Sequence, residues 1–168
     1  MAIISKNFFV RFFNLFPVII LFYLTLSEVN FNFIYSSFLS FNIIYIFIFY
    51  WVLKKPEILG YGFIFLAGIV NDVVIGLPIG VSSVTYLILS GFAAYIRHLT
   101  VQPSLIYDWI VFIPSIAVTN SLYFYILGIF FKIDIDYIAL VINSGMTILF
   151  YPIIGIILNI ITKMFTFK

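Results

Sequence analysis

The sequence predicts an all-α integral membrane protein, with six transmembrane helices in a single domain that covers residues 1–168. Three observations lead to this prediction. Only 8% of the residues are charged and 65% are hydrophobic, whereas about a quarter of the residues in a soluble domain are charged. The hydrophobic residues form six long runs, and the basic residues gather at alternate ends of these runs. This composition excludes a soluble enzyme and a disordered chain, since disorder requires low hydrophobicity and high net charge.

Six apolar runs approach the length of about 20 residues that a helix needs to cross the hydrocarbon core of a bilayer. They cover residues 12–28, 33–53, 58–75, 79–96, 109–131 and 137–162. The runs are continuously apolar rather than alternating, which favours helices over a β-barrel. The start of the second run is open, because Ser36, Ser37 and Ser40 are also compatible with a loop before a shorter helix. The first run is not followed by the small residues of a signal-peptide cleavage site, so we interpret it as a retained helix.

The distribution of Lys and Arg predicts that both termini lie in the cytoplasm. With the amino terminus inside, seven of the eight basic residues fall in cytoplasmic segments, and only Lys132 falls outside. The seven are Lys6, Arg11, Lys54, Lys55, Arg97, Lys163 and Lys168. An odd number of helices would export Lys163 and Lys168. We therefore expect a multi-pass protein with short loops.

Asp72 is the clearest ionisable residue at membrane depth, four residues before Gly76 at the outer end of the third run. A charged group there costs about 2.5–3.5 kcal/mol on insertion scales and marks a candidate functional position. Several roles are open: a hydrogen bond to a neighbouring helix, a cap on loop amides, a packing motif, or a pathway for protons or ions. A pathway normally needs a relay, and the sequence offers no second buried carboxylate or His.

Several glycines are separated from Asp72 by multiples of four residues. Gly60, Gly68 and Asp72 are expected on one face of the third helix, since residues four apart share a helical face. Small residues let helix backbones approach closely, so we predict tight packing of the third helix against the fourth. On the fourth helix the small residues that suit this contact are Ser83 with Gly91, or Ser90 with Ala94.

Prolines and polar residues mark further local features. The segment Gly76-Leu77-Pro78-Ile79-Gly80 predicts a tight outer turn, because Pro fixes φ and Gly tolerates positive φ. Three prolines inside the runs are expected to kink their helices, since each removes a backbone donor; they are Pro17, Pro114 and Pro152. Polar residues of the last two runs are expected to form hydrogen bonds across helices, worth about 0.6–2 kcal/mol each; they are Thr119, Asn120, Ser121, Asn143 and Ser144.

A search for catalytic or metal-binding residues gives no candidate. The chain has no Cys, and its single His, His98, follows Arg97 at a cytoplasmic helix end. The sequence has no His cluster, no intramembrane acidic pair and no GxSxG motif. Asp134 and Asp136 are too few for a Ca²⁺ site, which takes six to eight oxygen ligands. We therefore expect no enzymatic activity, no cofactor and no metal.

One segment resembles a family signature. It contains Tyr50-Trp51, Lys55-Pro56-Glu57, Gly62-Phe63, Ala67-Gly68-Ile69, Asp72 and Gly76-x-Pro78-x-Gly80. This succession of an aromatic-ended helix, a basic-Pro turn and a G-x-x-x-D-x-x-x-G-x-P-x-G segment resembles the rod shape-determining protein MreD family. The length and helix number of the whole chain are also similar to that family. Where the family commonly opens its second helix with Pro, this chain has Ser40-Phe41.

The resemblance implies a non-catalytic scaffold subunit of the bacterial cell-elongation complex in the inner membrane. The partners it implies are MreC, MreB filaments, a SEDS glycosyltransferase and a class B penicillin-binding transpeptidase, which build peptidoglycan. The residues it implies are those that shape the third helix and its turns and so support docking indirectly: Pro56, Gly68, Asp72, Gly76, Pro78 and Gly80. It also implies a fold similar to the membrane-embedded substrate-binding components of energy-coupling-factor (ECF) vitamin transporters.

That fold likeness leaves a second function open, a substrate-binding component of a small-molecule transporter. Such components dock their transport module through small residues on the first helix, and residues 12–28 contain neither Gly nor Ala. The scaffold is therefore the leading interpretation, ahead of the transporter component and of an ion pathway at Asp72.

Overall fold

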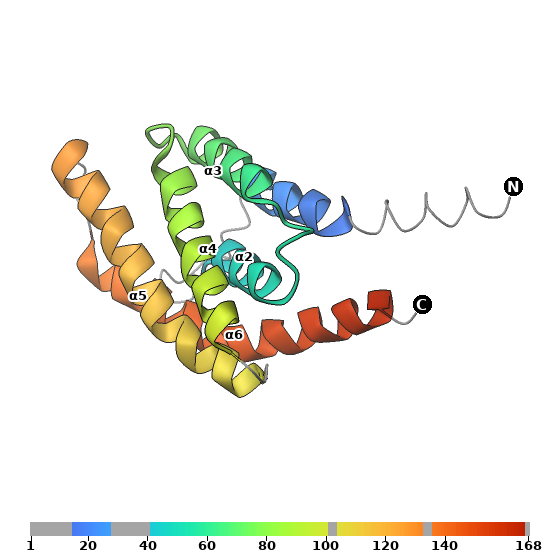
Figure 1. The fold of residues 1–168 in the computed structure, drawn as a ribbon. Helices are drawn as coiled ribbons and strands as arrows, with labels where there is room; N and C mark the ends of the chain where they lie inside the picture. Colours follow the sequence, from blue (N-terminus) through green and yellow to red (C-terminus); the bar gives the residue numbers. More distant parts are fainter. Residues whose placement is uncertain (1–14, 28–40, 101–103, 133–135, 167–168) are drawn as a thin grey trace, which may run out of the picture.

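The computed structural model describes residues 15–27, 41–100, 104–132 and 136–166. All regular secondary structure within these ranges is helical. The helices are Leu15–Leu26, α2 Ile43–Lys54, α3 Tyr61–Ile75, α4 Val81–Leu99, α5 Leu105–Phe130 and α6 Tyr137–Thr166 (Figure 1). Among the described residues, α5 and the stretch Tyr137–Lys163 of α6 are long and apolar enough to cross a membrane. The predicted all-α fold is thus confirmed for the described residues, together with two helices of membrane-spanning length.

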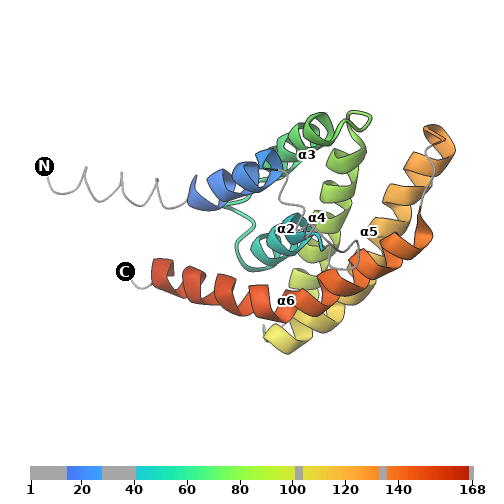
Figure 2. The same ribbon diagram turned by 180° about the vertical axis from the view of Figure 1, so that it is seen from behind.

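The helices pack around α2 and α4. Helix α4 contacts α2, α3 and α5, while α6 contacts α5 and α2 (Figures 1 and 2). Helices α2, α4, α5 and α6 therefore form a closed cycle of contacts, and α3 is added to it through α4. The helix Leu15–Leu26 contributes the buried side chains of Val18 and Leu21 to the same core.

Helix α2 is enclosed on every side. Each of its residues from Ile44 to Leu53 is buried, and a helix that is hydrophobic all round is expected in a core. It begins at Ile43 because the side chain of Asn42 caps it, accepting the N–H of Tyr45 at 3.2 Å. The expected continuous helix over 33–53 is therefore wrong at residues 41 and 42, and 33–40 lie outside the described residues. The 12 residues of α2 extend about 18 Å, less than the roughly 30 Å of a bilayer core.

The other helix bounds differ from the expected ones by a few residues. Helix α3 begins at Tyr61 rather than at residue 58, because a turn with Pro56 occupies the preceding positions. Helix α4 extends past residue 96 to Leu99, and α5 begins four residues early, at Leu105. This early start places Asp108 inside the first turn of α5. Residues 12–14 and 28 of the first expected helix lie outside the described part of the chain.

Pro152 interrupts the backbone hydrogen bonds of α6, and the structure compensates for this. A proline has no N–H, so the carbonyl four residues earlier lacks its helical donor. That carbonyl, of Ile148, instead accepts the indole N–H of Trp109 on α5 at 2.8 Å. Figure 2 shows that α6 is curved along its length. The proline thus creates a bond between α5 and α6.

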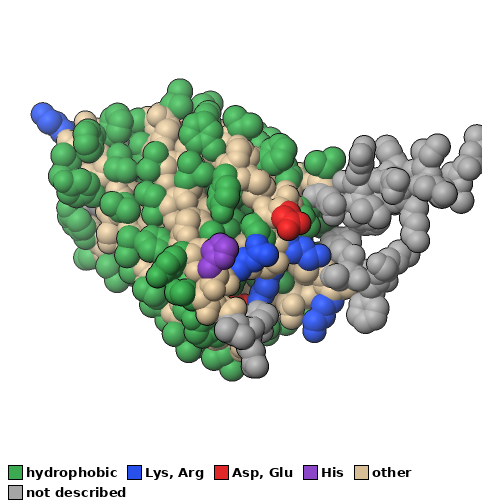
Figure 3. Space-filling view, viewed as in Figure 1, with side chains coloured by type: hydrophobic (Ala, Val, Ile, Leu, Met, Phe, Trp, Pro, Cys, Tyr) green, Lys and Arg blue, Asp and Glu red, His purple; other side chains and the backbone are tan. Residues whose placement is uncertain are grey.

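Large apolar side chains cover the outside of the long helices. In the most apolar 18-residue stretches of α5 and α6, 33% and 28% of the residues are buried, whereas the core helix of a soluble protein is mostly buried. Exposed examples are Ile110, Ile113, Ile153 and Ile157. Figure 3 shows a surface that is mainly hydrophobic, with most of its charged side chains gathered in one region. This distribution supports association with a membrane.

Candidate functional site

The carboxylate of Asp72 caps the start of the next helix. Asp72 lies near the end of α3 and is fully buried. Its Oδ2 accepts the backbone N–H of Gly80 at 2.7 Å, and its Oδ1 accepts that of Ser82 at 3.0 Å. Gly80 is the N-cap of α4 and has no side chain to cap the helix itself. Asp72 therefore replaces the missing cap and places a negative charge at the positive end of the α4 dipole.

The backbone carbonyl of Asp72 ends α3. It accepts the N–H groups of Gly76 and, at 2.8 Å, of Leu77. Gly76 has φ +75°, the left-handed conformation that commonly closes a helix and that glycine adopts without a steric penalty. Gly80 has φ +106°. The expected tight turn at 76–80 is confirmed, and one residue secures both of its ends.

Gly68 is the point of closest approach between α3 and α4. A Cβ atom added to Gly68 would lie 2.4 Å from the Cα of Ser83 and 2.5 Å from its nitrogen. The Ser83 hydroxyl donates to the carbonyl of Phe65 at 3.0 Å, and the Asn71 side chain donates to the Ser82 hydroxyl at 3.0 Å. Tight packing of α3 on α4 is therefore confirmed, and it is held by polar bonds as well as by small residues.

Not all of the expected small residues join this contact. An added Cβ on Gly60 would touch only the Phe63 side chain, at 3.9 Å, and on Gly91 it would meet nothing within 4 Å. The expected groove of Gly60, Gly68 and Asp72 is thus limited to Gly68 and Asp72, because α3 begins only after Gly60. Of the residues implied by the resemblance, Gly68, Asp72, Gly76, Pro78 and Gly80 lie together at the α3–α4 junction. Pro56 lies at the opposite end of α3, in the turn after α2.

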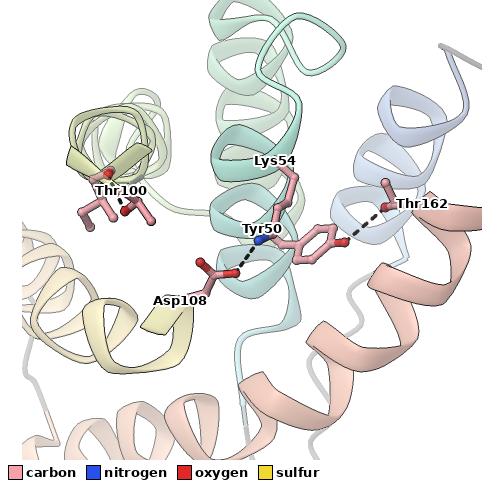
Figure 4. Close-up of polar contacts among 6 residues, drawn as sticks. Tyr50, Lys54, Thr100, Asp108 and Thr162 are labelled. Atoms are coloured by element: carbon pink, nitrogen blue, oxygen red, sulfur yellow. Dashed lines mark hydrogen bonds and ion pairs between the residues drawn. The ribbon is translucent and has the colours of Figure 1, made fainter. Parts of the chain in front are cut away.

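A second buried carboxylate, that of Asp108, lies outside the expected site, so the expectation that Asp72 has no buried acidic counterpart is wrong. The Nζ of Lys54, at the end of α2, lies 2.6 Å from the Oδ2 of Asp108, whose side chain is 1% exposed. The neighbouring Tyr50 hydroxyl donates to the hydroxyl of Thr162 on α6 at 3.2 Å (Figure 4). These contacts tie α2 to both α5 and α6. The predicted fifth run begins at residue 109 and therefore leaves Asp108 in the connection before it, although an acidic residue in the first helical turn is a common start signal.

Of the polar residues in α5 and α6, Asn120 forms the expected bond between helices. Its side-chain nitrogen donates to the Ser144 hydroxyl at 2.6 Å. Thr119 and Ser121 instead donate to carbonyls of their own helix, those of Ser115 and Ala117. The interhelical hydrogen bond is thus confirmed for one pair.

The remaining candidates have local or exposed positions. Asp136 caps α6, because its Oδ1 accepts the N–H groups of Ile138 and Ala139; Asp134 lies outside the described residues. His98 is exposed in the last turn of α4. In the described ranges, no three His, Cys, Asp or Glu side chains are grouped as metal ligands would be.

Comparisons with models of known protein families, with curated proteins and with solved structures found no match. Within the described residues, the fold and the site themselves define the class: an all-helical protein with two helices long and apolar enough to cross a membrane, in which a buried carboxylate joins two consecutive helices.

Proposed function

We propose that this protein is a non-catalytic scaffold subunit of the bacterial cell-elongation complex, embedded in the inner membrane with six crossings and both termini in the cytoplasm. The observation that carries the proposal is the set of contacts between helices made by the segment from Tyr50 to Gly80. Its distinctive residues make joints between helices: Tyr50 bonds Thr162, Gly68 contacts Ser83, and Asp72 caps α4. A segment that joins helices in this way is better suited to a rigid structure that binds partner helices than to a reaction centre.

The positions of the charges support the proposed topology. Lys54, Arg97 and Lys163 lie in the last turns of α2, α4 and α6, whereas Lys132 lies in the connection between α5 and α6. A chain that alternates in direction places the ends of α2, α4 and α6 on one side of the membrane. The excess of basic residues on that side supports a cytoplasmic location for it.

The outward face of α3 is the surface we propose for a partner. Helix α3 packs on α4 and leaves large apolar side chains exposed, among them Phe63, Phe65, Leu66 and Val73. An apolar helix face in a membrane contacts either lipid or another transmembrane helix. The family resemblance points to the transmembrane helix of MreC, with MreB, the SEDS glycosyltransferase and the class B transpeptidase in the same complex.

The experiment is a mild-detergent pull-down of the tagged full chain from bacterial membranes, followed by mass spectrometry. Wild-type protein is expected to recover MreC with the elongation synthases. The variant Phe65→Ala/Leu66→Ala is expected to reduce that recovery, while Ile156→Ala/Ile157→Ala, which changes two exposed residues on α6, leaves it unchanged. Recovery of paired ATPases and a transport subunit would contradict the scaffold and favour the vitamin-transporter component. The internal pairing of Asn71, Asp72 and Ser82 speaks against that alternative, since it leaves few polar groups for a soluble ligand.

A further inference from the structure

Basic side chains gather where α2, α4 and α6 end. We name Lys55, Arg97, His98 and Lys163 the basic rim. Figure 3 shows the single histidine, His98, next to Lys and Arg side chains in the charged region of the surface. The Tyr50–Thr162 bond places the ends of α2 and α6 side by side, and α4 contacts α2 directly. The rim is therefore one surface, built from three helix ends.

Within the described part of the chain, the cations of the rim are not neutralised by ion pairs. Lys54 pairs with the buried Asp108, whereas no ion pair joins Lys55, Arg97 or Lys163 to a described carboxylate. Glu57 is exposed in the same turn as Lys55 and offsets only part of the positive charge. The structure thus divides two adjacent lysines between two roles: Lys54 holds helices together, and Lys55 stays available to an external anion.

Exposed apolar side chains lie close in sequence to Arg97 and His98 of the rim. Leu99 follows His98 on α4, and Ile106 and Ile110 are exposed in the first two turns of α5. A ligand for this surface therefore needs a negative group for the cations and an apolar part for the helix sides. A phospholipid has both. An Arg guanidinium binds phosphate through two parallel hydrogen bonds, and clusters of cations at a membrane surface attract anionic lipids.

We propose that the basic rim binds the phosphate headgroup of an anionic phospholipid, with Arg97 and Lys55 as the main ligands and the acyl chains against Leu99 and the start of α5. This proposal rests on the membrane location in the proposed function but not on the identity of the protein partners.

The test uses the purified full chain in nanodiscs made of equal parts phosphatidylglycerol and phosphatidylcholine, with the lipids retained after detergent release measured by native mass spectrometry. Wild-type protein is expected to retain phosphatidylglycerol preferentially. Each cation removed is expected to lower that preference about fivefold, so Lys55→Gln/Arg97→Gln has the larger effect and each single variant a smaller one. Lys132→Gln is the matched control, because it removes an exposed charge at the opposite end of the long helices.

Three results would overturn the proposal. The double variant retains as much phosphatidylglycerol as wild type, Lys132→Gln loses as much as the rim variants, or the rim captures an acidic protein while retaining no lipid. The two proposals fail separately. Release of the protein from membranes by alkaline carbonate would defeat both, whereas a pull-down without MreC and with normal lipid retention would defeat only the scaffold function.

Discussion

The carboxylate of Asp72 lies 3.0 Å from the backbone nitrogen of Ser82, so a residue of α3 caps α4. The same residue ends its own helix through its carbonyl. Asp72 thus fixes both ends of a turn whose two glycines have positive φ. This structural role accounts for the buried carboxylate of Asp72 without a transport pathway.

Replacement of Asp72 should destabilise the protein according to how many acceptors remain. Asp72→Ala leaves the N–H groups of Gly80 and Ser82 without a partner and is expected to cost about 2 kcal/mol, whereas Asp72→Asn keeps one acceptor and costs about half as much. Thermal unfolding in detergent, followed by circular dichroism, measures the difference. Asp136→Ala is the comparison, because it removes a cap that is exposed to solvent. Equal stability of Asp72→Ala and wild type would show that the Asp72 carboxylate does not stabilise the turn between α3 and α4.

Gly68 should tolerate no side chain. Gly68→Ala forces a Cβ into the backbone of Ser83, and such overpacking typically costs about 1–3 kcal/mol; Gly68→Leu should cost more. Gly62→Ala in the same helix meets nothing within 4 Å, and it is expected to be neutral or to stabilise by up to about 1 kcal/mol. Unfolding temperatures of the variants decide the matter. If Gly68→Ala were as stable as Gly62→Ala, the close approach of α3 and α4 would be wrong.

The Lys54–Asp108 pair should show strong coupling in a double-mutant cycle. Lys54→Met leaves Asp108 buried without its partner and is expected to cost about 2–3 kcal/mol, below the cost of a fully buried pair because Lys54 is 20% exposed. Lys54→Met/Asp108→Leu should recover much of that loss. The control is Lys55→Met, which changes a neighbouring lysine outside the pair. Additive effects of the two single variants would mean that the pair contributes no coupling.

Trp109 and Pro152 should also be coupled. Trp109→Phe removes the donor to the Ile148 carbonyl and is expected to cost about 1 kcal/mol. In a Pro152→Ala background that carbonyl regains a donor from its own helix, so the same substitution should cost less. Unfolding free energies of the four proteins measure this. A loss that is identical in both backgrounds would argue against the compensation.

The turn at Asp72 could be predicted from local sequence because glycine and proline at fixed spacing restrict the backbone there. Tight α3–α4 packing followed from small residues four apart, although the periodicity could not show that α3 begins after Gly60. The start of α2 depends on Asn42, a polar residue within an apolar run. Its role as the N-cap is apparent only in the structure, where its side chain accepts the N–H of Tyr45.

Asp108 could not be located in the same way. Its partner, Lys54, is far away in the sequence, and a hydropathy pattern carries no information on which helix ends meet. The same is true of Trp109 and Ile148, whose bond depends on how α5 crosses α6. Contacts between helices that are far apart in the sequence could be found only in the three-dimensional structure. The turn at 76–80 and the presence of the helices could be predicted from local sequence.

The enclosure of α2 has a consequence for biogenesis. The structure leaves no side of this helix exposed, and two of the helices that cover it, α4 and α6, are synthesised after it. Until α6 has emerged from the ribosome, α2 lacks part of its surroundings, so its final placement must follow the insertion of later segments. The order of assembly therefore differs from the order of translation, and a chain interrupted before α6 would leave an incompletely covered helix for quality-control proteases.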